Sequence, residues 1–251
     1  MKKTLILLIS LLLLFACSSK KEVIKKTPPL NAEAVFEQAD KKAKGGYYEE
    51  AISLLEGVKS QDVSGKYAPL AQIRIGDTYF NEKLYEEAVV EYEHFLDMHP
   101  YHKYASYAQY KLAMSYFKRI GTIDVSYSVA QKAIDEFEKL LKVYPRNPYV
   151  SIVENRIMMC KGVLAEYEFY VGRFYFKKGS YTAAAQRFNT LLQNYPHSKK
   201  ESEALYYLGL SYKNAGETDR SLRAFTTLIE KYPTIELSRK AREIISSLNK
   251  Q

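Results

Sequence analysis

The chain has 251 residues, of which 47% are hydrophobic and 26% are charged, so it can build a sizeable folded core. The formal net charge is +8, but lysines alternate with glutamates along the expected helices and form no compact basic stripe, which argues against a nucleic-acid-binding protein. The two cysteines, Cys17 and Cys160, are too few for a disulfide framework, and Cys160 is expected to be a small buried side chain.

Residues 1–16 have the pattern of a secretory signal peptide. Lys2 and Lys3 precede the apolar run 5–15, which is shorter than the roughly 20 residues that a membrane-spanning helix needs. The run ends in "LFAC", with a leucine three residues before Cys17 and an alanine directly before it. This resembles the lipobox of bacterial lipoproteins, although Phe15 is bulkier than that pattern usually has. The alternative is an ordinary signal peptide followed by an unrelated cysteine.

The lipobox resemblance implies cleavage before Cys17 and covalent lipid on its sulfur and its amine. Two or more acyl chains are enough to anchor a folded domain stably. Because no aspartate follows the cysteine, the resemblance also implies sorting to the outer membrane. Residues 17–31 then form a lipidated start and a flexible tether, in which Pro28 and Pro29 oppose a helix. The tether lysines either lie near anionic headgroups or simply keep a spacer solvated.

A repeated pattern begins at residue 32. His or Tyr followed by Pro recurs at Pro100, Pro145, Pro196 and Pro233. Three of these prolines follow a glycine, a tyrosine, a small residue and an aromatic residue at identical distances. The sets are Gly76, Tyr79, Ala88 and Tyr92 before Pro100; Gly172, Tyr175, Ala184 and Phe188 before Pro196; and Gly209, Tyr212, Ser221 and Phe225 before Pro233. The pattern resembles the tetratricopeptide repeat (TPR), a helix-turn-helix of about 34 residues.

The spacing predicts how the two helices of each repeat pack. The glycine lets the first helix approach the second, the tyrosine fills space beside that contact, and the second helix carries a small residue and an aromatic residue on one face. The proline ends the second helix because it cannot continue the hydrogen-bond ladder. Gly179 and Gly216 stand between paired helices, where a left-handed conformation suits glycine.

We therefore predict an all-α fold: a right-handed superhelical solenoid of five TPRs with a C-terminal capping helix. The repeats are expected at 32–63, 66–100, 104–145, 150–196 and 199–233, and the cap at 234–251. The first repeat lacks a final proline, and the third holds about eight extra residues around "RIGTIDVS". The stretch from Val150 to Phe176 is expected to be one long helix.

No catalytic constellation is present in the sequence. It has no Gly-rich phosphate loop, no His-Glu-x-x-His and no Gly-x-Ser-x-Gly. His99 and His102 flank a Pro-Tyr pair without a nearby cysteine, so they predict turn histidines rather than a metal site. We expect no enzyme, no metal and no cofactor other than the covalent lipid on Cys17.

The most specific stretch is "LAEYEFYVGRFYFKKGSYTAAAQRFNTLLQNYP", residues 164–196. It resembles the fourth repeat of the BamD (YfiO) family, in which Tyr-Glu-aromatic, paired aromatics, a basic residue before Gly, and an Ala-rich helix with an Arg follow in that order. The lipobox, the short tether, "GYYEEAI" and "YPRNPYV" extend the resemblance to nearly the whole chain. The third repeat departs from the family, because only Asp124 remains of a charged Asp-Arg-Asp turn.

The resemblance implies a lipoprotein at the inner leaflet of the outer membrane, facing the periplasm, in the machinery that folds and inserts β-barrel proteins. Its implied partners are BamA, the barrel component, together with other assembly lipoproteins and unfolded outer-membrane protein substrates. Arg187 matches the family's docking arginine for BamA, and a guanidinium there suits a bidentate bond to a carboxylate. The alternative is a surface arginine that only solvates its helix.

Substrate is expected on the first helices of the first two repeats. By repeat position, the side chains that should face the groove are Phe36, Asp40, Lys44, Ile73, Asp77, Phe80 and Asn81. Mixed aromatic and polar groups suit an extended chain. The alternative is a groove that neighbouring helices fill.

Two other functions remain open at this point. The first is a different periplasmic TPR adaptor lipoprotein, such as a cell-division or cell-wall coordinator or a secretin pilotin; residues 18–31 are too short for the trimerising coiled coil that would favour a coordinator. The second is a cell-wall enzyme carried on repeats, against which the missing catalytic residues argue.

Overall fold

The computed structural model describes residues 31–121 and 123–248, with the backbone alone for residues 123–125. All regular structure in this part of the chain is α-helical, with no strand. The expected signal peptide (1–16), Cys17 and most of the expected tether lie outside the described residues, and so do the last three residues of the expected cap.

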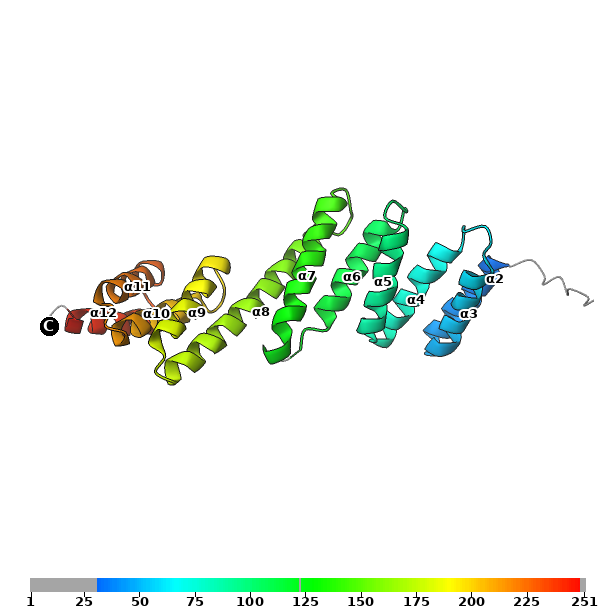
Figure 1. Ribbon diagram of the computed structural model, residues 1–251. Helices are drawn as coiled ribbons and strands as arrows, with labels where there is room; N and C mark the ends of the chain where they lie inside the picture. Colours follow the sequence, from blue (N-terminus) through cyan, green and yellow to red (C-terminus); the bar gives the residue numbers. More distant parts are fainter. Residues whose placement is uncertain (1–30, 122, 249–251) are drawn as a thin grey trace, which may run out of the picture. The chain divides into compact units, whose positions relative to one another are not determined.

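Eleven helices follow one another through the described residues (Figure 1): α2 (Ala32–Lys44), α3 (Tyr48–Gln61), α4 (Ala68–Glu82), α5 (Tyr85–Met98), α6 (Ala105–Lys118), α7 (Ile123–Val143), α8 (Val150–Lys177), α9 (Tyr181–Asn194), α10 (Glu201–Asn214), α11 (Thr218–Lys231) and α12 (Glu236–Leu248). Each helix packs against the next along the chain, and α12 packs on α11 and α10. Five helix pairs with a terminal helix are the architecture of a TPR solenoid, as the sequence predicted.

The two helices of a repeat meet where a glycine of the first lies against a ring of the second. A Cβ atom added to the glycine would come within 2.6–2.9 Å of that ring in three repeats, at Gly76 against Tyr92, Gly172 against Phe188 and Gly209 against Phe225. These three rings are completely buried. The glycines are therefore required for close packing, and the ring of the second helix itself occupies the space that a side chain would take.

Turns between paired helices use left-handed backbone, which glycine adopts without strain. Gly179 has φ 76° and Gly216 has φ 80°, which confirms the sequence prediction. The first repeat uses Gly46 in the same way, whereas the second repeat places Lys83 there with φ 69°. In these four repeats the left-handed residue reverses the chain within two or three residues.

Helix α8 is shared between two neighbouring repeats. Its 28 residues correspond to about 42 Å of helix, and it packs against both α7 and α9. This is the long helix expected from the sequence, one residue longer than predicted. Cys160 lies on α8 with no exposed surface, and burial raises the pKa of its thiol to about 12. It is a buried apolar side chain, not a reactive thiol.

Two glycines of α8 test the glycine–ring contact directly. Gly172→Ala should lower the free energy of unfolding by about 1–3 kcal/mol, because the new methyl group overlaps the Phe188 ring. The control is Gly162→Ala, where a Cβ meets nothing within 4 Å; it should raise stability by up to about 1 kcal/mol through helix propensity. Urea denaturation followed by circular dichroism measures both. Equal effects at the two positions would refute a packing role for Gly172.

Candidate functional site

A groove of about 690 Å³ lies between α2 and α4, the first helices of the first two repeats. Three residues predicted to face a substrate groove line it: Phe36, Asp40 and Lys44. Other lining residues were not predicted from the sequence; of these, Tyr67 and Arg74 make specific contacts.

The groove combines aromatic surface with charges of both signs. Arg74 bridges its two walls: its Nη1 lies 2.6 Å from Asp40 Oδ2, and its guanidinium lies 4.7 Å from the centre of the Phe36 ring. On the other side, the Tyr67 hydroxyl donates to Glu33 Oε1 at 2.8 Å, and this bond lowers the pKa of the Glu33 carboxyl. The Phe36 ring itself is only 6% exposed, because Arg74 covers it. The groove can therefore offer charged and hydrogen-bonding groups to a polypeptide.

The candidates in the second repeat are held by their neighbours. Ile73 is only 3% exposed and belongs to the core, so it lines no groove. Asp77 Oδ1 accepts hydrogen bonds from the hydroxyls of Tyr92 at 2.6 Å and Tyr107 at 2.7 Å. Because two hydroxyls satisfy this carboxylate, it is a structural group that joins repeats two and three.

Lys111 of α6 completes this cluster and covers Phe80. Its Nζ lies 3.5 Å from the centre of the Phe80 ring and 3.4 Å from Asp77 Oδ1. Burial lowers the pKa of Lys111, while the Asp77 carboxylate acts in the opposite direction. Asn81 is exposed at the end of α4. In the second repeat, neighbouring side chains therefore fill the face that the sequence left open to substrate.

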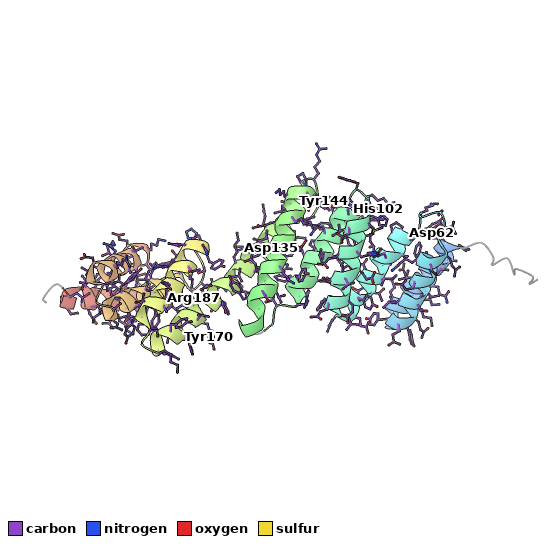
Figure 2. The ribbon with its side chains drawn as sticks, viewed as in Figure 1. Asp62, His102, Asp135, Tyr144, Tyr170 and Arg187 are labelled. Carbon is purple, nitrogen blue, oxygen red and sulfur yellow. The ribbon has the colours of Figure 1, made fainter. Side chains whose placement is uncertain are left out.

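Arg187, the predicted docking residue, lies on α9 beside α8 (Figure 2). Its Nη1 is 3.3 Å from Oε2 of Glu168, a carboxylate with only 3% exposure, while the arginine side chain remains 42% exposed. The guanidinium therefore has an internal partner and a free outer part. It can hold its own repeat together and still present donors to another protein.

The positions of Glu168 and Arg187 hold another pair of polar side chains in two other repeats. We call such a pair, which joins the first helix to the second, a polar clasp. Gln109 Nε2 donates to Glu136 Oε2 at 2.7 Å and to its backbone oxygen at 3.1 Å. Gln72 Nε2 also reaches Glu91, at 3.4 Å from Oε2 and 3.5 Å from the backbone oxygen, but it lies closer to His94 Nδ1. In each case a residue four positions before the small residue of the first helix reaches the second helix. Repeat four keeps this clasp with other residues. Glu168 takes the place of the glutamine on the first helix, and Arg187 takes the place of the glutamate on the second.

Other kinds of site were sought in the same part of the chain. Residues 31–121 and 123–248 hold no group of three or more His, Cys, Asp and Glu side chains arranged to bind a metal. The rings of His99 and His102 lie 6.3 Å apart and both contact Phe95, which is a packing arrangement. None of the described helices combines the length and the apolar character required to cross a bilayer.

The YfiO family model, described as an outer membrane lipoprotein, matches residues 28–221. The chain belongs to this family. Similar relatives are the outer membrane protein assembly factors BamD of Rickettsia prowazekii, 29% identical over 80% of this chain and 79% of the relative, and of Vibrio cholerae, 26% identical over 81% and 87%. BamD of Neisseria meningitidis serogroup A is 24% identical over 82% of each chain.

Solved structures with a similar course of the chain are TPR proteins. The TPR2AB domain of yeast Sti1 is 14% identical, with a TM-score of 0.47 over 86% of this chain and 84% of that domain. A TPR protein of Thermus thermophilus is also 14% identical, with a TM-score of 0.36 over 88% of this chain and all of that one.

The clasp of repeat four can be tested by exchanging its chemistry. Arg187→Glu should lower the free energy of unfolding by about 1–3 kcal/mol, because two carboxylates then face each other at a buried position. Adding Glu168→Gln recreates the Gln–Glu clasp of repeats two and three and should recover most of that loss. Denaturant midpoints of both variants measure the effect. If the double variant were no more stable than Arg187→Glu alone, the clasp would not be an equivalent repeat position.

Proposed function

We propose that the protein is a lipid-anchored, non-catalytic scaffold of the machinery that assembles β-barrel proteins in the outer membrane. The observation that carries this proposal is the family match over residues 28–221, together with relatives that are named outer membrane protein assembly factors. The helical repeats support it, because stacked repeats present extended surfaces to other proteins. The described clusters of polar residues form structural contacts between helices rather than a reaction centre.

The proposed anchor is Cys17, with a diacylglycerol thioether on its sulfur and an acyl group on its amine. Residues 18–31 connect it to α2, and a chain of that length extends at most about 50 Å. The domain would thus stay close to the periplasmic face of the membrane while its repeats remain free to engage partners. Two or more acyl chains make such an anchor stable, whereas one chain alone binds only marginally.

The proposed docking surface for a BamA-like barrel protein lies on the fourth repeat around Arg187. Glu168 holds the guanidinium in place, so less side-chain entropy is lost when a partner carboxylate binds its exposed part. An acidic side chain of the partner would form a charge-assisted, bidentate contact there. Other assembly lipoproteins are proposed partners on the remaining repeat surface.

The proposed substrate site is the groove between α2 and α4. An extended segment of an unfolded barrel protein would lie along Asp40 and Lys44, with Arg74 and the ring of Tyr67 as the central contact. Such segments alternate aromatic and polar side chains, which match the aromatic and charged walls of the groove. The second repeat contributes Arg74 and not Asp77, because Asp77 is already engaged within the repeats.

The anchor predicts lipid labelling at one cysteine only. In cells fed a radiolabelled fatty acid, the wild-type chain should incorporate label and fractionate with outer membranes. Cys17→Ser, expressed behind a secretory signal without a lipobox, should incorporate none and should appear in the soluble periplasmic fraction. Cys160→Ser is the matched control and should label like the wild type. Label on the Cys17→Ser variant would exclude the proposed anchor.

The docking surface predicts a variant that folds but does not bind. Glu168→Gln combined with Arg187→Glu should leave stability close to wild type, yet it replaces the docking cation with an anion. In a mild-detergent pull-down from cells, recovery of a large barrel protein should fall more than about tenfold, as expected for reversing one close interfacial charge pair. The matched control exchanges the clasp of repeat three, Gln109→Glu with Glu136→Gln. Capture of cell-wall proteins alone by the wild-type chain would overturn the proposed function.

A further inference from the structure

Three loops lie along one edge of the repeats, where second helices end and the next first helices begin. We call residues 62–67, 97–104 and 142–149, including the adjoining helix ends, the loop edge. Figure 1 shows the loops side by side, and Figure 2 labels one residue in each: Asp62, His102 and Tyr144. Contact between two of them is direct, because the Tyr144 hydroxyl donates to the Pro100 carbonyl oxygen at 3.0 Å.

The loop edge exposes large apolar side chains that the repeats do not use. Val63 and Tyr101 are 101% and 99% exposed, and Met98 and Val143 at the adjoining helix ends are 62% and 52% exposed. At the opposite edge of the same repeats, Tyr47 is 58% exposed. Apolar groups so fully in water are unfavourable unless something covers them, and here they gather at consecutive loop tips.

The charge of the loop edge is positive. Its basic residues are Lys66, Lys103, Lys142 and Arg146, and its acidic residues are Asp62, Asp97 and, at the start of α2, Glu33. The Asp62 carboxylate accepts the backbone N–H of Ala68 at 2.8 Å, so its charge is directed into the start of α4. Lys103 lies 5.0 Å from the centre of the Tyr104 ring, which is itself part of the edge.

The helix termini add to this asymmetry. Of the helices that begin at the loop edge, α6 and α8 have no acidic residue in their first turns. Asp62 compensates the start of α4, and α2 carries Glu33 in its first turn. By contrast, α3 and α5 begin at the opposite edge and carry pairs of glutamates there, Glu49 with Glu50 and Glu86 with Glu87. The positive ends of two helix dipoles, those of α6 and α8, therefore meet no acidic first turn at the loop edge.

We propose that the loop edge rests on an anionic lipid surface. Tyrosines with an apolar body and a polar tip suit the headgroup level of a bilayer, and lysines beside them suit lipid phosphates. Separate side chains on three loop tips fit a fluid surface better than a shape-complementary protein site. This inference extends the proposed lipid anchor and rests on it in one respect: the anchor brings the chain to the membrane, and the loop edge then orients it.

The course of the chain supports this orientation. Helix α2 begins at the loop edge, because Glu33 in its first turn accepts a hydrogen bond from Tyr67 of the first loop at 2.8 Å. The residues that lead back to Cys17 therefore join the repeats at the edge that carries Tyr101 and Val63.

The absence of tryptophan from the chain makes a site-specific test possible. The full lipidated chain carrying Tyr101→Trp is reconstituted into vesicles that contain phosphatidylglycerol and brominated acyl chains, which quench tryptophan on contact. We expect a loss of emission and a shift to shorter wavelength. The matched control is Tyr47→Trp, an exposed tyrosine at the opposite edge, which should keep its emission. Adding Lys103→Gln and Arg146→Gln should lower the ratio of contacting to free loop edge about fivefold per charge removed.

The outcomes separate the loop edge from the anchor. If the chain floats with vesicles but the Tyr101→Trp variant keeps its emission, the anchor stands and the loop-edge inference is wrong. Equal quenching at positions 101 and 47 would also refute a preferred edge. A chain that does not float at all would overturn both proposals. Emission changes at position 101 that need a co-purified protein and not lipid would assign the loop edge to a protein partner and likewise refute the inference.

Discussion

The contact between a backbone glycine and a buried aromatic ring sets the geometry on which the rest of the structure depends. At Gly172 and Gly209 the rings of Phe188 and Phe225 stand where a side chain would be, so the two helices pack at the distance that a bare Cα allows. Repeating this contact makes the pairs stack in the same manner. The surfaces proposed to bind partners follow from that stacking, because they are the helix faces that point away from the glycine–ring contact.

Polar clasps fix each pair in register without creating reactive groups. Gln72 and Gln109 show the neutral form, in which an amide binds a glutamate and its backbone oxygen. In repeat four the clasp becomes Glu168 and Arg187, which leaves a charged group partly in solvent. A position that elsewhere only stabilises the fold thus carries, through a change of charge, the cation of the proposed docking surface. One arginine can hold its own repeat together and still present hydrogen-bond donors to solvent.

The sequence predicted features that depend on residues within one helix pair. Gly179 was enough to predict the turn, and the spacing between Gly172 and Phe188 was enough to predict the ring contact. Both features are local and recur at equal distances. Phe36 was placed at a groove by its repeat position, and it lines the groove between α2 and α4 although Arg74 covers most of its ring. Asp77 was placed there by the same rule, but its environment depends on Tyr107, a side chain from the next repeat. The position of a residue in its repeat predicts the helix face on which it lies. It does not predict which long side chains of the next repeat will contact it.

The two edges of the repeats differ in their charge and in the apolar side chains that they expose. This difference connects the fold to the proposed function. Glutamates such as Glu49 and Glu86 compensate the helix dipoles at one edge, which is the arrangement expected for a surface that stays in water. At the loop edge α6 and α8 have no acidic first turn, beside Lys103 and an almost fully exposed Tyr101. Asp62 compensates α4 and Glu33 lies in the first turn of α2, so the two edges differ chiefly in the apolar side chains that the loop tips expose. These side chains contribute nothing to packing within the repeats, and the proposed anionic surface beside the anchor would cover them.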